Sequence, residues 1–226
     1  MNLNKNSLIK FFILIVLLCS ITHITTFANS EKEQKIQTLI SQFSVTTAKN
    51  NIVYLFGQLK NESGKNLSGT TIEIWQTDSE GIYDHPDDPS TNQRDKTFQF
   101  YGSEKTDQDG WYAFRTTIPG KYHPRPQHIH FKVKLGNKTL LTSQFYFGED
   151  LESLKNERIF QSAGNDSSSL LLQLARYNGR IVAEGNIVVD GGSGSKKLTK
   201  TPRQPEGPYY PMKDLTAYDN DLLILE

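Results

Sequence analysis

The chain has 226 residues, with 25 basic and 25 acidic side chains, so its formal charge at neutral pH is zero. This balance argues against a nucleic acid or an anionic membrane surface as the main partner. The length fits one sizeable domain with short extensions.

Residues 1–28 have the organisation of a secretory signal peptide. Lys5 and Lys10 precede the apolar run 11–18, and the segment that ends at Ala28 offers small residues at the outer positions of a cleavage site. We therefore expect export to the periplasm or the extracellular space, with cleavage near Ala28 and a mature chain of net charge −2. An uncleaved anchor is disfavoured, because the apolar run is shorter than the roughly 20 residues of a membrane span.

Cys19 is the only cysteine of the chain, and it lies inside this leader. Acylation at Cys19, which would make a lipoprotein, is a weaker alternative because the bulky Leu18 precedes it. The mature chain then has no thiol, so it can form no disulfide and offers no thiolate ligand or cysteine nucleophile. Any metal site has to use His, Tyr, Asp or Glu.

Residues 29–50 predict a short helical extension ahead of the main domain. After a charged stretch, apolar side chains recur at helical spacing at Ile36, Leu39, Ile40 and Phe43.

From residue 51 the pattern changes to short strands separated by turns. Runs rich in β-branched and aromatic residues alternate with clusters of Gly, Asn and Asp, which is typical of an antiparallel β-sandwich. We expect this all-β core to cover residues 51–190, followed by a Gly/Ser-rich linker at 191–200 and a C-terminal segment at 201–226. The expected strands are 52–59, 70–75, 111–118, 128–135, 138–147 and 180–190. Residues 151–178 are less regular, and 169–176 fits either helix or strand.

The segment 120–131 concentrates polar chemistry at the start of one expected strand. Side chains alternate between the two faces of a strand, so His128 and His130 share one face. Two imidazoles on a rigid strand are a candidate metal site, although such a pair on an exposed strand is also compatible with no function. Arg125 precedes them between two prolines, which stiffen the segment that carries the guanidinium.

Tyrosines recur near these histidines, at Tyr83 in a turn and at Tyr122 just before the strand. A phenol titrates near pH 10, but a trivalent cation can hold it as phenolate, and this hard oxygen donor favours ferric iron. Two phenolates and two neutral imidazoles would leave a ferric ion with a small residual charge and an open position. Either tyrosine is also compatible with an ordinary place at the rim of a sandwich.

Several separate segments, in the same order, resemble the intradiol ring-cleavage dioxygenases, which are non-haem ferric enzymes that open catechols between the two hydroxyls. The resemblance covers roughly residues 50–190 and rests on 57–59, 73–83, 106–114, 118–122, 125–130 and 144–147.

The resemblance implies a β-sandwich that binds Fe(III), and it implies roles for individual residues. The iron ligands of the family match Tyr83, Tyr122, His128 and His130, and Tyr122 matches the tyrosine that leaves the metal when the substrate chelates. Arg125 and Gln144 match residues placed beside the reacting ring. The implied reaction joins O2 to a small aromatic diol and gives a muconate-type diacid.

The chain departs from the family pattern in two ways. Only two residues separate Tyr122 from Arg125, which resembles an exported short-loop branch and prevents a carry-over of substrate identity. The segment 201–223 resembles a motif that family members carry before the first core strand, which suggests a circular permutation. The alternative is an unrelated Pro-rich tail; if the permutation holds, Tyr209 or Tyr210 should approach the site.

Two other functions stay open at this point. A secreted β-sandwich that binds a ligand or a protein would need no metal, and an enzyme with zinc or copper would need the histidines but not the tyrosines. The joint presence of the four ligand candidates favours the dioxygenase. The sequence does not decide the oligomeric state, a homodimer included, or which catechol is the substrate.

Overall fold

The computed structural model describes residues 30–43, 51–148, 151–194 and 197–224. The residues group into two compact units, 1–42 and 43–226. In the first unit residues 30–41 are helical, in agreement with the predicted helical extension. The predicted signal peptide lies outside the described residues. No helix in the described ranges has the length and apolarity that a bilayer span requires.

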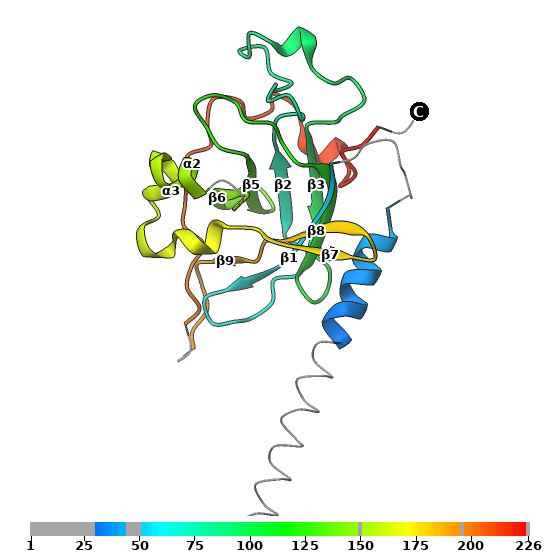
Figure 1. The fold of residues 1–226 in the computed structure, drawn as a ribbon. Helices are drawn as coiled ribbons and strands as arrows, with labels where there is room; N and C mark the ends of the chain where they lie inside the picture. The colour runs from blue at the N-terminus through cyan, green and yellow to red at the C-terminus, as the bar shows by residue number, and fades with distance from the viewer. Residues whose placement is uncertain (1–29, 44–50, 149–150, 195–196, 225–226) are drawn as a thin grey trace, which may run out of the picture. The chain divides into compact units, whose positions relative to one another are not determined.

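The second unit contains two β-sheets (Figure 1). The first has the order β4-β1-β8-β7, with β9 also paired to β1. Its strands are β1 (Ile52–Asn61), β4 (Trp111–Thr117), β7 (Gln173–Tyr177), β8 (Arg180–Glu184) and β9 (Ile187–Val189). β1 pairs with β4 in antiparallel fashion but with β8 and β9 in parallel, so this sheet is mixed, where the sequence predicted antiparallel strands throughout.

The second sheet is antiparallel and has the order β3-β2-β5-β6. Its strands are β2 (Thr71–Trp75), β3 (Tyr101–Lys105), β5 (His128–Leu135) and β6 (Lys138–Tyr146). The sequence predicted three of these strands and missed β3, whose polar and Gly-containing sequence gives a weak strand signal.

The hydrophobic core combines apolar faces of both sheets, which confirms the β-sandwich. Leu55 and Phe114 come from the first sheet, while Ile129, Phe131 and Phe145 come from the second, and all five side chains are fully buried. The rings of Phe131 and Phe145 stack with centroids 4.3 Å apart. The alternation of strand side chains therefore directs Ile129, Phe131 and Val133 of β5 into the core and leaves its histidines on the opposite face.

The irregular stretch after β6 is mostly helical. It contains α2 (Leu151–Asn156), α3 (Arg158–Gln161) and the 3-10 helix η2 (Gly164–Leu170), and only its end forms β7. Shorter 3-10 helices occur at η1 (Thr91–Gln93) and η3 (Leu215–Ala217). The segment is anchored beside β6 by an apolar cluster of Tyr146, Leu154, Phe160 and Leu170.

The C-terminal segment belongs to the same compact unit as the sandwich. Arg115 on β4 forms a two-point ion pair with Asp221, with Nε donating to Oδ1 over 2.7 Å and Nη2 donating to Oδ2. Backbone hydrogen bonds flank the pair, because Arg115 N–H donates to Asn220 and Arg115 C=O accepts from Leu222. The end of the described chain is therefore part of the fold; whether its position reflects a circular permutation stays a prediction.

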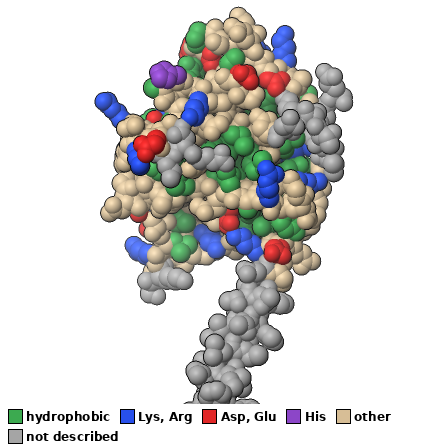
Figure 2. Space-filling view, viewed as in Figure 1, with side chains coloured by type: hydrophobic (Ala, Val, Ile, Leu, Met, Phe, Trp, Pro, Cys, Tyr) green, Lys and Arg blue, Asp and Glu red, His purple; other side chains and the backbone are tan. Residues whose placement is uncertain are grey.

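The surface agrees with the balanced charge of the sequence. On the face in Figure 2, basic and acidic side chains are scattered among neutral ones and do not gather into a patch of one sign.

Candidate active site

Strand β5 presents His128 and His130 on one face, as the sequence predicted. Both side chains are nevertheless buried, with 4% and 3% of their surface exposed, so they do not lie on an open strand face. A later part of the chain covers this face, as described below.

The pairing register of the second sheet fixes the neighbours of each histidine. Trp75 on β2 and Gln144 on β6 lie directly across from His130, and Tyr146 on β6 lies across from His128. The Trp75 indole stacks on the His130 imidazole with ring centroids 4.8 Å apart and planes 9° apart. This stacking holds the His130 ring in one orientation.

Two glycines bring the tyrosine-bearing loops together. A Cβ on Gly120 would lie 2.2 Å from the Gly81 nitrogen, and one on Gly81 would lie 2.3 Å from the Lys121 carbonyl oxygen. Only residues without a side chain allow so close an approach of two backbones. The loop after β2 and the loop before β5 therefore lie against each other, and each supplies one tyrosine.

The four predicted metal ligands meet at this point. The Tyr83 and Tyr122 rings are 5.6 Å apart, and the Tyr122 and His128 rings are 6.3 Å apart. Tyr83 lies 6.4 Å from His130, and the two imidazoles are 4.8 Å apart. Tyr83 is buried, whereas Tyr122 is partly exposed.

Hydrogen bonding determines which nitrogen of His128 carries the proton. Its Nδ1 lies 2.6 Å from the Pro126 carbonyl oxygen, which can only accept, so Nδ1 donates. In the neutral ring Nε2 is then left with a free lone pair, and it faces the His130 Nε2 at 3.1 Å. A backbone carbonyl that orients the second nitrogen is the usual partner of a metal-bound histidine.

Burial keeps the site uncharged when no metal is bound. Burial first, and the charge of Arg125 second, lower the pKa of His128 to about 3, and burial together with His128 lowers the pKa of His130. Burial also raises the pKa of the Tyr83 hydroxyl. The histidines are therefore in the neutral form that metals bind, and Tyr83 needs a strong nearby cation to ionise.

The donor set fits a ferric ion. Among the described residues, the buried Tyr83 hydroxyl and His130 Nδ1 have no hydrogen-bond partner. Buried polar groups are nearly always satisfied, so an unpaired hydroxyl beside two converging imidazoles suggests a missing ligand. The described residues contain no cluster of three or more His, Cys, Asp or Glu that could hold a metal. A metal bound by His128 and His130 would therefore need the tyrosine oxygens as further ligands.

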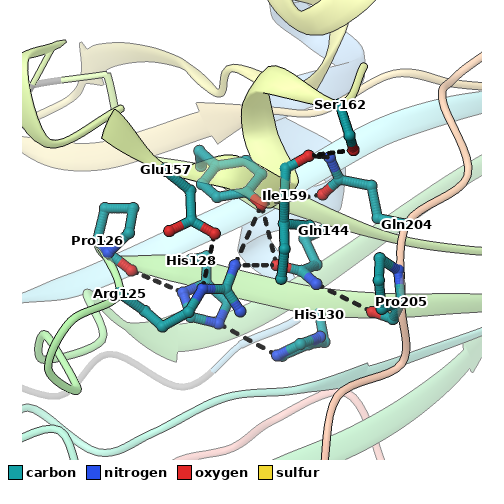
Figure 3. A network of polar contacts seen from close by, with 11 residues as sticks. Arg125, Pro126, His128, His130, Gln144, Glu157, Ile159, Ser162, Gln204 and Pro205 are labelled. Atoms are coloured by element: carbon teal, nitrogen blue, oxygen red, sulfur yellow. Dashed lines mark hydrogen bonds and ion pairs between the residues drawn. The ribbon is translucent and has the colours of Figure 1, made fainter. Parts of the chain in front are cut away.

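Arg125 and Gln144 lie beside this set in a polar network (Figure 3). Arg125 Nη2 donates to Gln144 Oε1 over 2.7 Å and to the Tyr146 hydroxyl over 3.2 Å. Arg125 Nε forms an ion pair with Glu157 over 2.9 Å. The guanidinium is thus held on two sides near the imidazoles.

Residues 201–211, here named the strap, cover the histidine face of β5. Gln144 donates to the Pro205 carbonyl over 3.0 Å, and Gly207 lies so near His130 that a Cβ would sit 3.2 Å from its Cε1. The Tyr209 ring packs 4.7 Å from Tyr83 and 5.6 Å from Tyr122. The structure therefore brings Tyr209 to the site, as expected if the segment resembles the family motif.

Tyr210, the next residue of the strap, packs against Trp75. Its ring meets the Trp75 indole edge-on at 4.9 Å, and its hydroxyl donates to Glu73 over 3.0 Å. Lys132 also lies 3.4 Å above the Tyr210 ring and pairs with Glu206. These contacts attach the strap to the sheet without reaching the ligand set.

The sequence interpretation missed three residues of the network: Tyr146, Glu157 and Gln204. Tyr146 could have been found, because it is two positions after Gln144 on a strand and so shares its face. Glu157 and Gln204 come from a short helical segment and from the strap, where no local pattern marks them. His85 is buried against Tyr209 and His123 is exposed, and neither belongs to the histidine pair.

Comparisons with known proteins identify dioxygenases as relatives of this chain. A family model described as Dioxygenase matches residues 24–125. The protocatechuate 3,4-dioxygenase beta chain of Burkholderia cepacia is 31% identical over 146 residues, which are 60% of this chain and 60% of that protein. The catechol 1,2-dioxygenase 1 of Acinetobacter lwoffii is 33% identical over 109 residues, which are 40% of this chain and 34% of that protein. The chain is thus similar in sequence to intradiol dioxygenases over these segments. It spans less than two thirds of the length of either relative.

Solved structures agree at the level of the fold. The intradiol ring-cleavage dioxygenase of Tetranychus urticae superposes with a TM-score of 0.50 at 16% identity, over 65% of this chain and 84% of that one. At this identity the likeness bears on the fold alone, and it agrees with an intradiol dioxygenase sandwich.

Proposed function

We propose that this chain is an Fe(III)-dependent intradiol dioxygenase that cleaves a small aromatic diol between its hydroxyls with O2 and releases a muconate-type diacid. One observation carries the proposal. Tyr83, Tyr122, His128 and His130 come from three segments and converge in one place, where the buried Tyr83 hydroxyl has no partner among the described residues. A binding module without a metal has no reason to bury this set.

These four side chains would hold the ferric ion, which supplies a Lewis acid and a template for the diol when bound. Tyr122 is the partly exposed member of the set, so its hydroxyl is the one that an entering diol can reach. Its phenolate oxygen would take up a proton from a diol hydroxyl.

Arg125 would stabilise negative charge that develops on the diol ring. Its guanidinium lies beside the imidazoles and its position is fixed by Gln144, Tyr146 and Glu157. A cation stabilises developing negative charge most when its position is already fixed and does not change during the reaction. Gln144, which is itself held by the Pro205 carbonyl, would keep one nitrogen of this cation turned toward the site.

The proposal implies a small aromatic diol and O2 as partners. The place of action rests on the predicted signal peptide, from which we propose a secreted enzyme after cleavage near Ala28. The short connection between Tyr122 and Arg125 leaves few residues to line a substrate pocket at that point, so we expect a site that accepts several catechols.

The visible spectrum of the mature protein, residues 29–226, tests the proposal. With ferric iron we expect a broad tyrosinate-to-iron band that shifts to longer wavelength when catechol is added without oxygen. Tyr83→Phe should weaken the band and the iron content, whereas Tyr177→Phe, on β7 of the other sheet, should leave both unchanged. A folded protein that stays colourless with ferric iron would contradict the proposal.

A further inference from the structure

Glu157 is a buried carboxylate whose placement the metal site does not explain. It lies at the junction of α2 and α3 with 8% of its surface exposed. It occupies the position before the first residue of α3, yet its side chain makes no capping hydrogen bond to that helix. A buried carboxylate is strongly unfavourable without a partner, and here the partner is Arg125, at 2.9 Å.

The ion pair uses one edge of the guanidinium and leaves another free for the site. Glu157 meets Nε, while Nη2 donates to Gln144 and Tyr146. Among the described residues Arg125 Nε has no hydrogen-bond partner, so Glu157 acts on the guanidinium through its charge, while the hydrogen bonds at Nη2 fix the direction of the planar group. Gln144 and Tyr146 are neutral, so among these contacts Glu157 supplies the charge that balances Arg125.

The segment that carries Glu157 is itself held firmly. Leu154 and Phe160, on either side of it, are buried in the apolar cluster with Tyr146. The Phe160 ring meets the Tyr146 ring edge-on at 5.0 Å, and Gln204 of the strap donates to the Ile159 carbonyl over 2.7 Å. The carboxylate therefore has a fixed place relative to β6, as Figure 3 shows.

We propose that Glu157 is a positioning residue that holds the Arg125 guanidinium in its reactive orientation, and that it acts on turnover through Arg125 without touching iron or substrate. This inference rests on the proposed function, because it gives Arg125 a task in the reaction. Without the carboxylate charge, the guanidinium can turn about its Cδ–Nε bond toward solvent, while the four candidate metal ligands keep their own supports.

The test compares Glu157→Gln with Glu152→Gln, a matched control on the neighbouring helix α2 that removes an exposed carboxylate paired with Lys155. For Glu157→Gln we expect kcat to fall by about 10- to 100-fold, as for other small misplacements of a catalytic group. Iron content and the tyrosinate-to-iron band should stay at the level of the unmodified protein. Glu152→Gln should match the unmodified protein in every measurement.

A second readout does not depend on turnover. In a nitrogen-15 NMR spectrum of the iron-free protein, the Nε signal of Arg125 should be shifted by the nearby Glu157 carboxylate. In Glu157→Gln this shift should be lost. Glu157→Asp retains the charge one methylene farther away, so its kcat should lie between those of Glu157→Gln and the unmodified protein. If Glu157→Gln does not fold, Glu157→Asp replaces it in the test.

A double-mutant cycle distinguishes action through Arg125 from other effects. In an Arg125→Leu background, Glu157→Gln should change kcat by less than about twofold, because nothing is left to position. An equal loss in both backgrounds would overturn the inference, and so would an unchanged kcat or a parallel fall of kcat and iron content. If the unmodified protein shows neither the iron band nor turnover, the proposed function fails and this inference fails with it. If the unmodified protein shows both and Glu157→Gln has an unchanged kcat, the inference about Glu157 is wrong and the proposed function stands.

Discussion

Arg115 and Arg125 are two enclosed arginines in the same sandwich, and each pairs with a carboxylate from a later part of the chain. Arg115 is fully buried on β4, and Asp221 engages its Nε and one terminal nitrogen while the backbone on both sides is hydrogen-bonded to the C-terminal segment. Arg125 lies in a loop, and its contacts are shared between a carboxylate, an amide and a phenol.

The difference separates a structural cation from a reactive one. At Arg115, the ion-pair partner belongs to the C-terminal segment, so the pair connects this segment to β4. At Arg125, the partners converge from β6 and the α2–α3 junction on a group that lies beside the metal ligands. We therefore expect loss of Arg115 to appear in stability and loss of Arg125 to appear in turnover.

The largest effect is expected for Arg115→Leu. The change leaves Asp221 without its partner, and breaking an enclosed ion pair in this way costs about 3–5 kcal/mol. We expect the free energy of unfolding, measured in urea, to fall by about this amount, with the iron band lost only as the protein unfolds. Asp221 is 26% exposed, so the lower end of the range applies if water reaches it. A stability loss below about 1 kcal/mol would show that the pair does not join the segment to the sandwich.

Arg125→Leu tests whether Arg125 acts in turnover. We expect kcat to fall by about 100-fold or more, the loss typical of a removed charge-stabilising donor, while the protein still binds iron and shows its visible band. Arg158→Leu, an exposed arginine next to Glu157, serves as the matched control and should leave turnover unchanged. If iron content falls in parallel with turnover, Arg125 has a structural role like that of Arg115.

The sequence indicated a role for Arg125 but not for Arg115. The proline-flanked Arg125 and the alternating His128 and His130 carry local signals, and their side-chain directions follow from strand periodicity. Arg115 carries no such signal, because it occurs in an ordinary strand and its partner lies 106 residues later.

The fold, too, was only partly predictable from the sequence. Strand periodicity predicted the sandwich and most strands, but β3 and the parallel pairing of β8 and β9 to β1 depend on tertiary contacts. The proximity of Tyr83 and Tyr122 also depends on a long-range contact, between the backbones at Gly81 and Gly120. Motif resemblance could propose the four ligands, whereas Glu157 and Gln204 became visible only when segments distant in sequence were placed together.

Glu104 should make the free energy of unfolding depend on pH. Its carboxylate contacts β4, the strand that carries Arg115. The Ala113 N–H on β4 donates to its carboxylate over 2.6 Å, and Asn220, next to Asp221, donates to the Ala113 carbonyl over 2.9 Å. Burial raises the pKa of Glu104 from 4.5 to about 7, and hydrogen bonds to its carboxylate from the Ala113 N–H and the Asn220 side chain oppose the rise only in part. The folded state therefore binds the Glu104 proton more tightly than the unfolded state does.

The sign of the effect follows from this proton affinity. As the pH rises from about 4.5 to about 7, the folded protein loses the advantage of a neutral Glu104, so the free energy of unfolding should fall. Glu104→Gln stays neutral, so it should be more stable than the unmodified protein above pH 7 by about 1–3 kcal/mol and similar to it near pH 4.5. Urea unfolding of both proteins at the two pH values measures the difference. Equal pH slopes would mean that water already solvates this carboxylate, and that the packing around Arg115 is looser than its burial indicates.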